Sequence, residues 1–163
     1  EALLQGQFDE ASEWLEHYLA SLNVHMQIEE RYLFPEFANI EHNSKWDVSL
    51  YEKEHQKLKQ LNQTIKEDLQ WLSEQELSPS QQRRNIIALL DKEKTVKGLS
   101  EHHEAREEEA MLKELDDAYM DDMDGKAESG TAAERARRYK ELQMDIKLTW
   151  AEVMGAVKDM LNQ

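Results

Sequence analysis

The sequence predicts an all-helical protein built as an up-and-down four-helix bundle. Residues that interrupt helices are scarce, with 5 Gly and 2 Pro among 163 residues. Apolar residues recur every three or four positions over long stretches, which is the spacing of one helix face. Short polar segments separate these stretches, and long amphipathic helices with short connections are typical of bundles.

The first half of the chain predicts a helix remnant followed by two long helices. Residues 1–7 resemble the last turn of a helix that stops at Gly6. The first complete helix is expected over residues 9–37, where Pro35 should loosen the last turn. After a short linker, the second long helix is expected over residues 46–75.

The second half of the chain predicts two more helices. A third helix is expected over residues 81–121, with Ser80 as its N-cap and Gly98 as a weak point. The whole chain is then expected to form a bundle over residues 1–122, whose first helix is truncated. A loop over residues 123–131 should connect the bundle to an extra C-terminal helix, residues 132–163, packed on or into it.

Composition excludes several classes of partner. The 35 acidic and 20 basic residues give a net charge of −15, which repels nucleic acid and anionic membrane surfaces. No apolar run approaches the roughly 20 residues that a membrane span needs. The absence of cysteine excludes disulfides and thiolate metal sites and fits a reducing compartment, so a cytoplasmic location is expected.

One pattern with metal-ligand spacing occurs twice. His25 stands four residues before Glu29, and His103 stands four residues before Glu107. Both pairs are followed at the same spacing by a second Glu and then by large apolar residues. On a helix, positions i and i+4 lie on one face about one turn apart, so an imidazole and a carboxylate there can reach the same ion. Two copies predict a metal site built between helices.

A histidine on the intervening helix, His55, adds a fifth candidate ligand. The predicted ligand set is His25, Glu29, His55, His103 and Glu107. Neutral imidazoles and carboxylates suit iron, manganese or zinc. Two glutamates from facing helices favour a dinuclear site, because carboxylates can bridge two ions.

Two other histidines remain open alternatives. His102 is about 100° around the helix from His103, so at most one of the two points fully inward. His103 is preferred because Glu107 lies at the correct spacing from it. His42 lies in the linker, from which a side chain can fold onto an open coordination position.

The run from His25 to Pro35 resembles, position by position, the His-x-x-x-Glu-Glu-x-x-Leu-Phe-Pro signature of the hemerythrin-like (HHE cation-binding) family. His55 matches the third-helix His of that family, and His103 with Glu107 matches its fourth-helix pair. The resemblance covers roughly residues 1–115. Residues 25–29 are also similar to the hemerythrin-like domain of the eukaryotic F-box iron sensor.

This resemblance implies a non-haem centre of two iron ions, joined by an oxo or hydroxo group and by carboxylates. Glu29 and Glu107 would be the bridging carboxylates, and His25, His55 and His103 would be terminal ligands. The implied partner is O2 or another small oxidant.

The chain departs from the family pattern in two places. Lys59 stands where the O2-carrying hemerythrins have a second third-helix His, which implies an open position at the metal. The first-helix His is also absent, and we expect it to lie upstream of Glu1 because residues 1–7 resemble the end of that helix. The alternative is that the last helix fills the slot, where Glu141 or Asp145 would offer a carboxylate.

Three functions fit these observations. The first is a di-iron module that binds or senses O2, iron or a related oxidant, favoured because no nucleophile, general base or Gly-rich phosphate loop is evident. The second is a di-iron enzyme acting on peroxide, nitric oxide or ferrous iron at the open position. The third is a metal-free helical interaction domain with an acidic surface.

Overall fold

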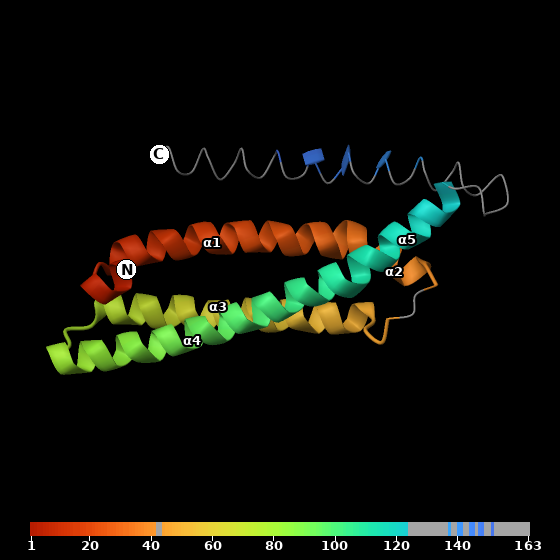
Figure 1. The fold of residues 1–163 in the computed structure, drawn as a ribbon. Coiled ribbons are helices and arrows are strands. Elements are labelled where there is room, and N and C mark those ends of the chain that lie inside the picture. The colour runs from red at the N-terminus through yellow and green to blue at the C-terminus, as the bar shows by residue number, and fades with distance from the viewer. Residues whose placement is uncertain are drawn as a thin grey trace. The chain divides into compact units, whose positions relative to one another are not determined.

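The computed structural model describes residues 1–41 and 44–123, with side chains to residue 118. It also describes eight separate positions, 137, 140, 141, 144, 145, 147, 148 and 151, all with helical backbone and exposed side chains. The described part of the chain is helical and contains no strand, which confirms the predicted all-α class (Figure 1).

Three long helices account for most of the described chain. They are α1 (Phe8–Ile28), α3 (Val48–Glu74) and α4 (Pro79–Arg106). Two shorter helices, α2 (Phe34–Asn39) and α5 (Leu112–Met123), continue α1 and α4 through π-helical turns at Glu29–Leu33 and Glu107–Met111. Because the described residues hold three long helices, the four-helix bundle stays a prediction. Of the loop predicted over residues 123–131, Met123 is the last residue of α5, and residues 124–131 lie outside the described residues.

The ends of the helices show why the chain folds into these elements. Residues Ala2–Gln5 form a 3-10 turn that ends at Gly6, whose φ of 73° lies in the left-handed region. Gly6 N–H donates to the Leu3 carbonyl and Gln7 N–H donates to the Ala2 carbonyl, the bond pattern of a glycine-terminated helix. The predicted Gly stop is therefore confirmed.

The start of α4 corrects one prediction. The helix begins at Pro79, so Ser78 and not Ser80 is the capping residue. Gln81 Oε1 accepts from the Ser78 backbone N–H at 3.1 Å and from the Ser78 hydroxyl at 2.6 Å. Proline is favoured at the first helical position because its fixed φ suits the helix and its missing N–H needs no partner there.

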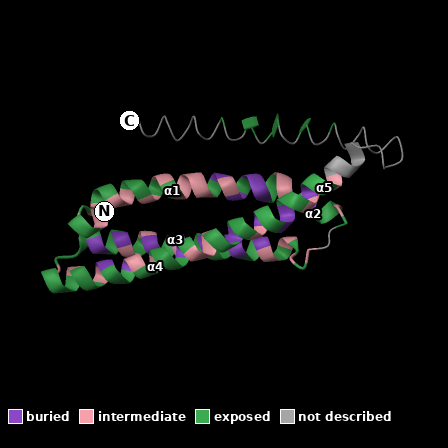
Figure 2. Cartoon of the chain, in the orientation of Figure 1, coloured by how far each residue is buried: buried purple, intermediate pink, exposed green. Residues whose placement is uncertain are grey.

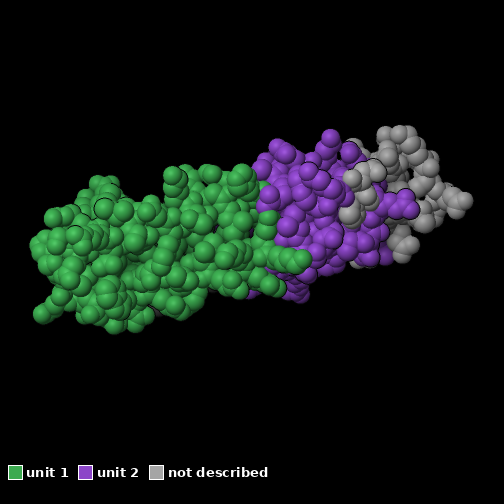
Figure 3. Space-filling model, turned by 90° about the horizontal axis from the view of Figure 1, so that it is seen from below, with its two compact units in different colours: residues 1–20, 53–103 green, residues 21–52, 104–163 purple. Residues whose placement is uncertain are grey.

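The described residues divide into two compact units, each with its own core (Figures 2 and 3). Unit 1 comprises residues 1–20 and 53–103, and unit 2 comprises residues 21–52 and 104–163. The core of unit 1 is aliphatic and contains Leu58, Ile65, Leu69, Leu72, Leu89 and Val96. The core of unit 2 is largely aromatic and contains Phe34, Phe37, Tyr51, Met111 and Leu115.

No helix among the described residues has the length and apolar content needed to cross a membrane.

Candidate metal centre

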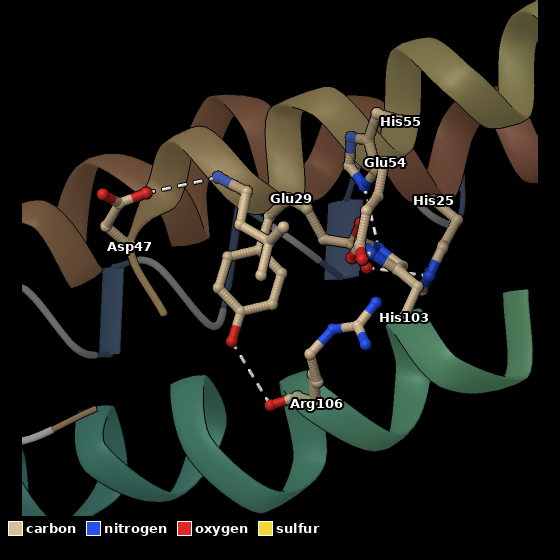
Figure 4. Close-up of polar contacts among 9 residues, drawn as sticks. His25, Glu29, Asp47, Glu54, His55, His103 and Arg106 are labelled. Carbon is tan, nitrogen blue, oxygen red and sulfur yellow. Dashed lines mark hydrogen bonds and ion pairs between the residues drawn. The ribbon is translucent and has the colours of Figure 1, made fainter. Parts of the chain in front are cut away.

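Two histidines meet in the interior of unit 1. His55 on α3 is fully buried and His103 on α4 is 2% exposed, and their Nε2 atoms lie 3.0 Å apart (Figure 4). Two bare nitrogen lone pairs repel each other at that distance. The 3.0 Å approach therefore requires a proton or a cation between the two rings.

A buried carboxylate holds the other side of His103. Glu54 on α3 is 9% exposed, and its Oε2 lies 3.0 Å from His103 Nδ1 (Figure 4). A carboxylate accepts but does not donate, so His103 Nδ1–H is the donor in this bond. The neutral His103 ring then carries its lone pair on Nε2, which is the nitrogen that faces His55.

In unit 2 the first predicted pair of ligands is formed as its spacing predicts. His25 Nε2 lies 2.8 Å from Glu29 Oε1, and the Glu29 side chain is 4% exposed. Glu29 begins a π-helical turn, in which Phe34 N–H donates to the carbonyl of Glu29 five residues earlier. Pro35 follows directly and lacks an N–H, so the regular i→i−4 pattern could not have continued through it.

The second pair carries the same backbone feature. Glu107 also begins a π-helical turn, and Leu112 N–H donates to its carbonyl. No proline stands near this turn, since Lys113 occupies the position that matches Pro35. The shared feature of the two turns is the buried Glu at the first position. Single π-helical turns occur frequently at functional sites, where they redirect a side chain without ending the helix.

Tyr51 braces the turn that carries Glu107. Its ring is fully buried, and its hydroxyl donates to the carbonyl of Arg106 at 3.3 Å. Burial, together with the negative charges of Glu107 and Glu114, raises the pKa of Tyr51 to about 12 despite the opposing charge of Arg106. Tyr51 therefore stays a neutral hydrogen-bond donor at physiological pH.

Four buried side chains have donor atoms close enough to share an ion. One oxygen or nitrogen from each of Glu29, His55, His103 and Glu107 lies within 4.8 Å of the others. Donors on opposite sides of one ion with bonds of about 2.1 Å lie about 4.2 Å apart, so this span is close to what an ion requires. Two buried carboxylates beside two imidazoles would also gain from a cation, because buried negative charge is costly without compensation. We name these four residues the buried quartet.

The structure places the remaining candidates differently. The His25 side chain is 37% exposed and contacts Glu29, so its role as a ligand stays a prediction. His102 is exposed beside the buried His103, as expected from their angular separation. Glu141 is exposed and pairs with Arg137 at 3.6 Å. Asp145 and Lys59 are also exposed, and His42 lies outside the described residues.

Glu54 is a site residue that the sequence interpretation missed. In a sequence with 35 acidic residues, a Glu beside a His does not stand out. A signal was nevertheless present, because Glu54 is three residues after Tyr51 and four before Leu58, both of which belong to the apolar stripe of α3. A carboxylate at such a position is buried and needs a partner.

Searches of protein-family models, of curated proteins and of solved structures found no match to this chain. The buried side chains of the quartet are therefore the only support for a metal centre in the described residues.

Proposed function

We propose that this chain is a non-haem iron protein that binds or senses O2 or a related small oxidant. The observation that carries the proposal is the buried quartet, which combines two imidazoles with two carboxylates and contains no thiolate. This donor set suits iron and manganese, and it is the set expected of a hemerythrin-like centre. In that family the protein forms a four-helix bundle with two irons, and His25 would complete the ligands here.

Each residue of the quartet has a distinct task in this proposal. His55 and His103 supply uncharged nitrogens from α3 and α4, and Glu29 and Glu107 supply the negative charge that offsets the cation. Met111 is the last residue of the π-helical turn that Glu107 begins, and it is fully buried in the core of unit 2. Bound iron would supply electrons to a small oxidant, and the chain would control access to it.

An anaerobic ferrous titration tests the proposal. The expected result is uptake of at least one iron per chain, or two if His25 completes a dinuclear centre, and a new near-ultraviolet absorption band after addition of O2. His103→Ala should abolish uptake, whereas His102→Ala, its exposed neighbour on the same helix, should not change it. Circular dichroism should show that both variants remain helical. Trace uptake by the unmodified chain, or equal uptake by both variants, would reject the proposal in favour of a metal-free interaction domain.

One observation favours a catalytic version of the same centre. Lys59 is exposed and stands where a further third-helix His would be expected in an O2 carrier, so one coordination position would be open to substrate. An enzyme acting on peroxide, nitric oxide or ferrous iron would use that position. Iron-loaded protein that consumes peroxide faster than the same concentration of free iron would support this candidate over simple binding.

A further inference from the structure

Glu54 is a buried carboxylate that contacts His103 but does not belong to the buried quartet. Its Oε2 is 3.0 Å from His103 Nδ1, and the side chains of Glu54 and His103 are 11% and 2% exposed. Glu54 contacts Nδ1 of His103, whereas Nε2 of the same ring lies 3.0 Å from His55. Glu54 can therefore affect an ion bound at Nε2 without contacting that ion. The hydrogen bonds thus link Glu54 on α3 to His103 on α4, and His103 to His55 on α3 (Figure 4).

We propose that Glu54 is a positioning residue that fixes His103 with its proton on Nδ1, so that Nε2 is available to a metal ion. This proposal rests on the proposed metal-binding function. A carboxylate that accepts the outer N–H of a metal-binding imidazole holds the ring in place and makes the inner nitrogen a better donor. Glu54 and His55 are neighbours on α3, so one helix both supplies a candidate ligand and orients the ligand of α4.

The same geometry has a consequence for His55. With the His103 lone pair on Nε2 and no ion between the rings, a contact of 3.0 Å needs a hydrogen on His55 Nε2. An ion that binds both Nε2 atoms must displace that hydrogen. His103 is therefore set for metal in advance, and His55 is the histidine whose ring must change on loading.

Nitrogen NMR of the histidine rings tests the proposal in the metal-free protein. Long-range proton–nitrogen correlations should show that His103 carries its hydrogen on Nδ1. Glu54→Ala should remove that preference, and Glu54→Gln should keep it, because the amide oxygen still accepts a hydrogen bond. Glu52→Gln is the matched control, since Glu52 is exposed two residues earlier on α3. A proton on His103 Nε2 in the unmodified protein would overturn the proposal.

Metal affinity gives the second readout, with Co²⁺ as the probe because its visible spectrum also reports coordination. Glu54→Ala should weaken binding by roughly 10- to 100-fold, as expected when an outer-shell partner is lost, and Glu54→Gln should retain most of the affinity. Equal loss in both variants would show that Glu54 is a direct ligand and would overturn the proposal, as would unchanged affinity in Glu54→Ala. If the unmodified chain binds no Co²⁺ or iron, the proposed function fails, while the NMR comparison still decides the role of Glu54.

Discussion

Buried charge defines the candidate site at the level of single residues. Glu29 and Glu107 are 3% and 5% exposed, and both belong to the buried quartet. Burying a carboxylate removes it from water at a cost of several kcal/mol, which a nearby cation can offset. A carboxylate at these positions therefore lowers the stability of the folded chain but favours the binding of a cation. Such opposition between stability and binding is common at functional sites.

The first prediction separates binding from stability with Glu107→Gln. The amide has nearly the same shape but no charge, so the metal-free variant should be more stable by about 1–2 kcal/mol, or roughly 3–6 °C in melting temperature. The same change should abolish tight iron binding, because it removes one of the two carboxylates. Thermal melting and a ferrous titration measure the two effects.

Glu108→Gln is the matched control, because Glu108 is the exposed neighbour of Glu107 in the same π-helical turn. It should leave both the melting temperature and the iron uptake close to those of the unmodified chain. A metal-free Glu107→Gln protein that is less stable than the control would contradict this view of the site.

The second prediction concerns the alkaline stability that Tyr51 controls. Its pKa is about 12 in the folded chain and about 10 in the unfolded chain, so the unfolded state releases its proton first as pH rises. Tyr51 should thus leave the free energy of unfolding unchanged below pH 9 and lower it by about 1.4 kcal/mol at pH 11. Tyr51→Phe cannot ionise and should lack this loss, although it gives up a hydrogen bond worth about 1 kcal/mol at neutral pH.

Urea unfolding at pH 7, 9 and 11 measures the effect as the difference between Tyr51→Phe and the unmodified chain. Other groups titrate in both proteins and cancel in that difference. The variant should be the less stable protein at pH 7, and the gap should close or reverse at pH 11. A gap of constant size would show that the hydroxyl is not held neutral by its surroundings.

At the level of elements, the repeated motif is repeated in the backbone as well. Both His-x-x-x-Glu pairs lead into a π-helical turn that starts at the Glu. Pro35 accounts for the irregular hydrogen bonding of the first turn but has no counterpart at the second. The feature common to both turns is the buried glutamate at the first position. A widened turn changes the direction in which the residues after it face relative to that glutamate.

Glycine substitutions give the prediction that belongs to this scale. Gly98 lies inside α4, and a Cβ there would have no neighbour within 4 Å, so Gly98→Ala should stabilise the chain by about 1 kcal/mol, or roughly 2–4 °C. Gly6→Ala should destabilise by about 1 kcal/mol or more, because its φ is +73° and its Cβ would approach Gln82 Nε2 at 3.3 Å. Melting of the two variants side by side tests both, and a loss of stability in Gly98→Ala would be the contrary result.

The sequence predicted the helices well and the local backbone poorly. Apolar spacing placed the second long helix at residues 46–75, against Val48–Glu74 for α3. It could not show the π-helical turns, because one widened turn shifts the hydrogen bonds without altering residue composition. The Ser78 cap was missed because Ser80 offered the same hydroxyl, and only the preference for Pro at the first helical position distinguishes them.

The candidate site was predictable in part for a similar reason. Fixed i, i+4 spacing identified Glu29, Glu107 and His103, and apolar spacing identified His55. Glu54 depends on a contact between residues 49 positions apart, and such contacts follow from packing that periodicity does not specify. His25 shows the opposite case, because correct spacing did not decide how deeply the side chain is buried.

At the scale of the whole molecule, metal binding should appear as added stability. A ligand that binds only the folded chain stabilises it by about 2.7 kcal/mol when its free concentration is 100 times the dissociation constant. That corresponds to roughly 5–10 °C for a chain of this size. Anaerobic melting with and without Fe²⁺ measures the shift, and His103→Ala should show none. An equal shift in both proteins would indicate ions held by the acidic surface, where the net charge is −15.

The most direct test of the metal centre is a crystal of iron-loaded protein measured on both sides of the iron absorption edge. Iron bound at the buried quartet should give anomalous-difference density within bonding distance of His55 Nε2 and His103 Nε2, and also of carboxylate oxygens of Glu29 and Glu107. Iron density only on the acidic exterior, with the two histidines still in direct contact, would contradict it.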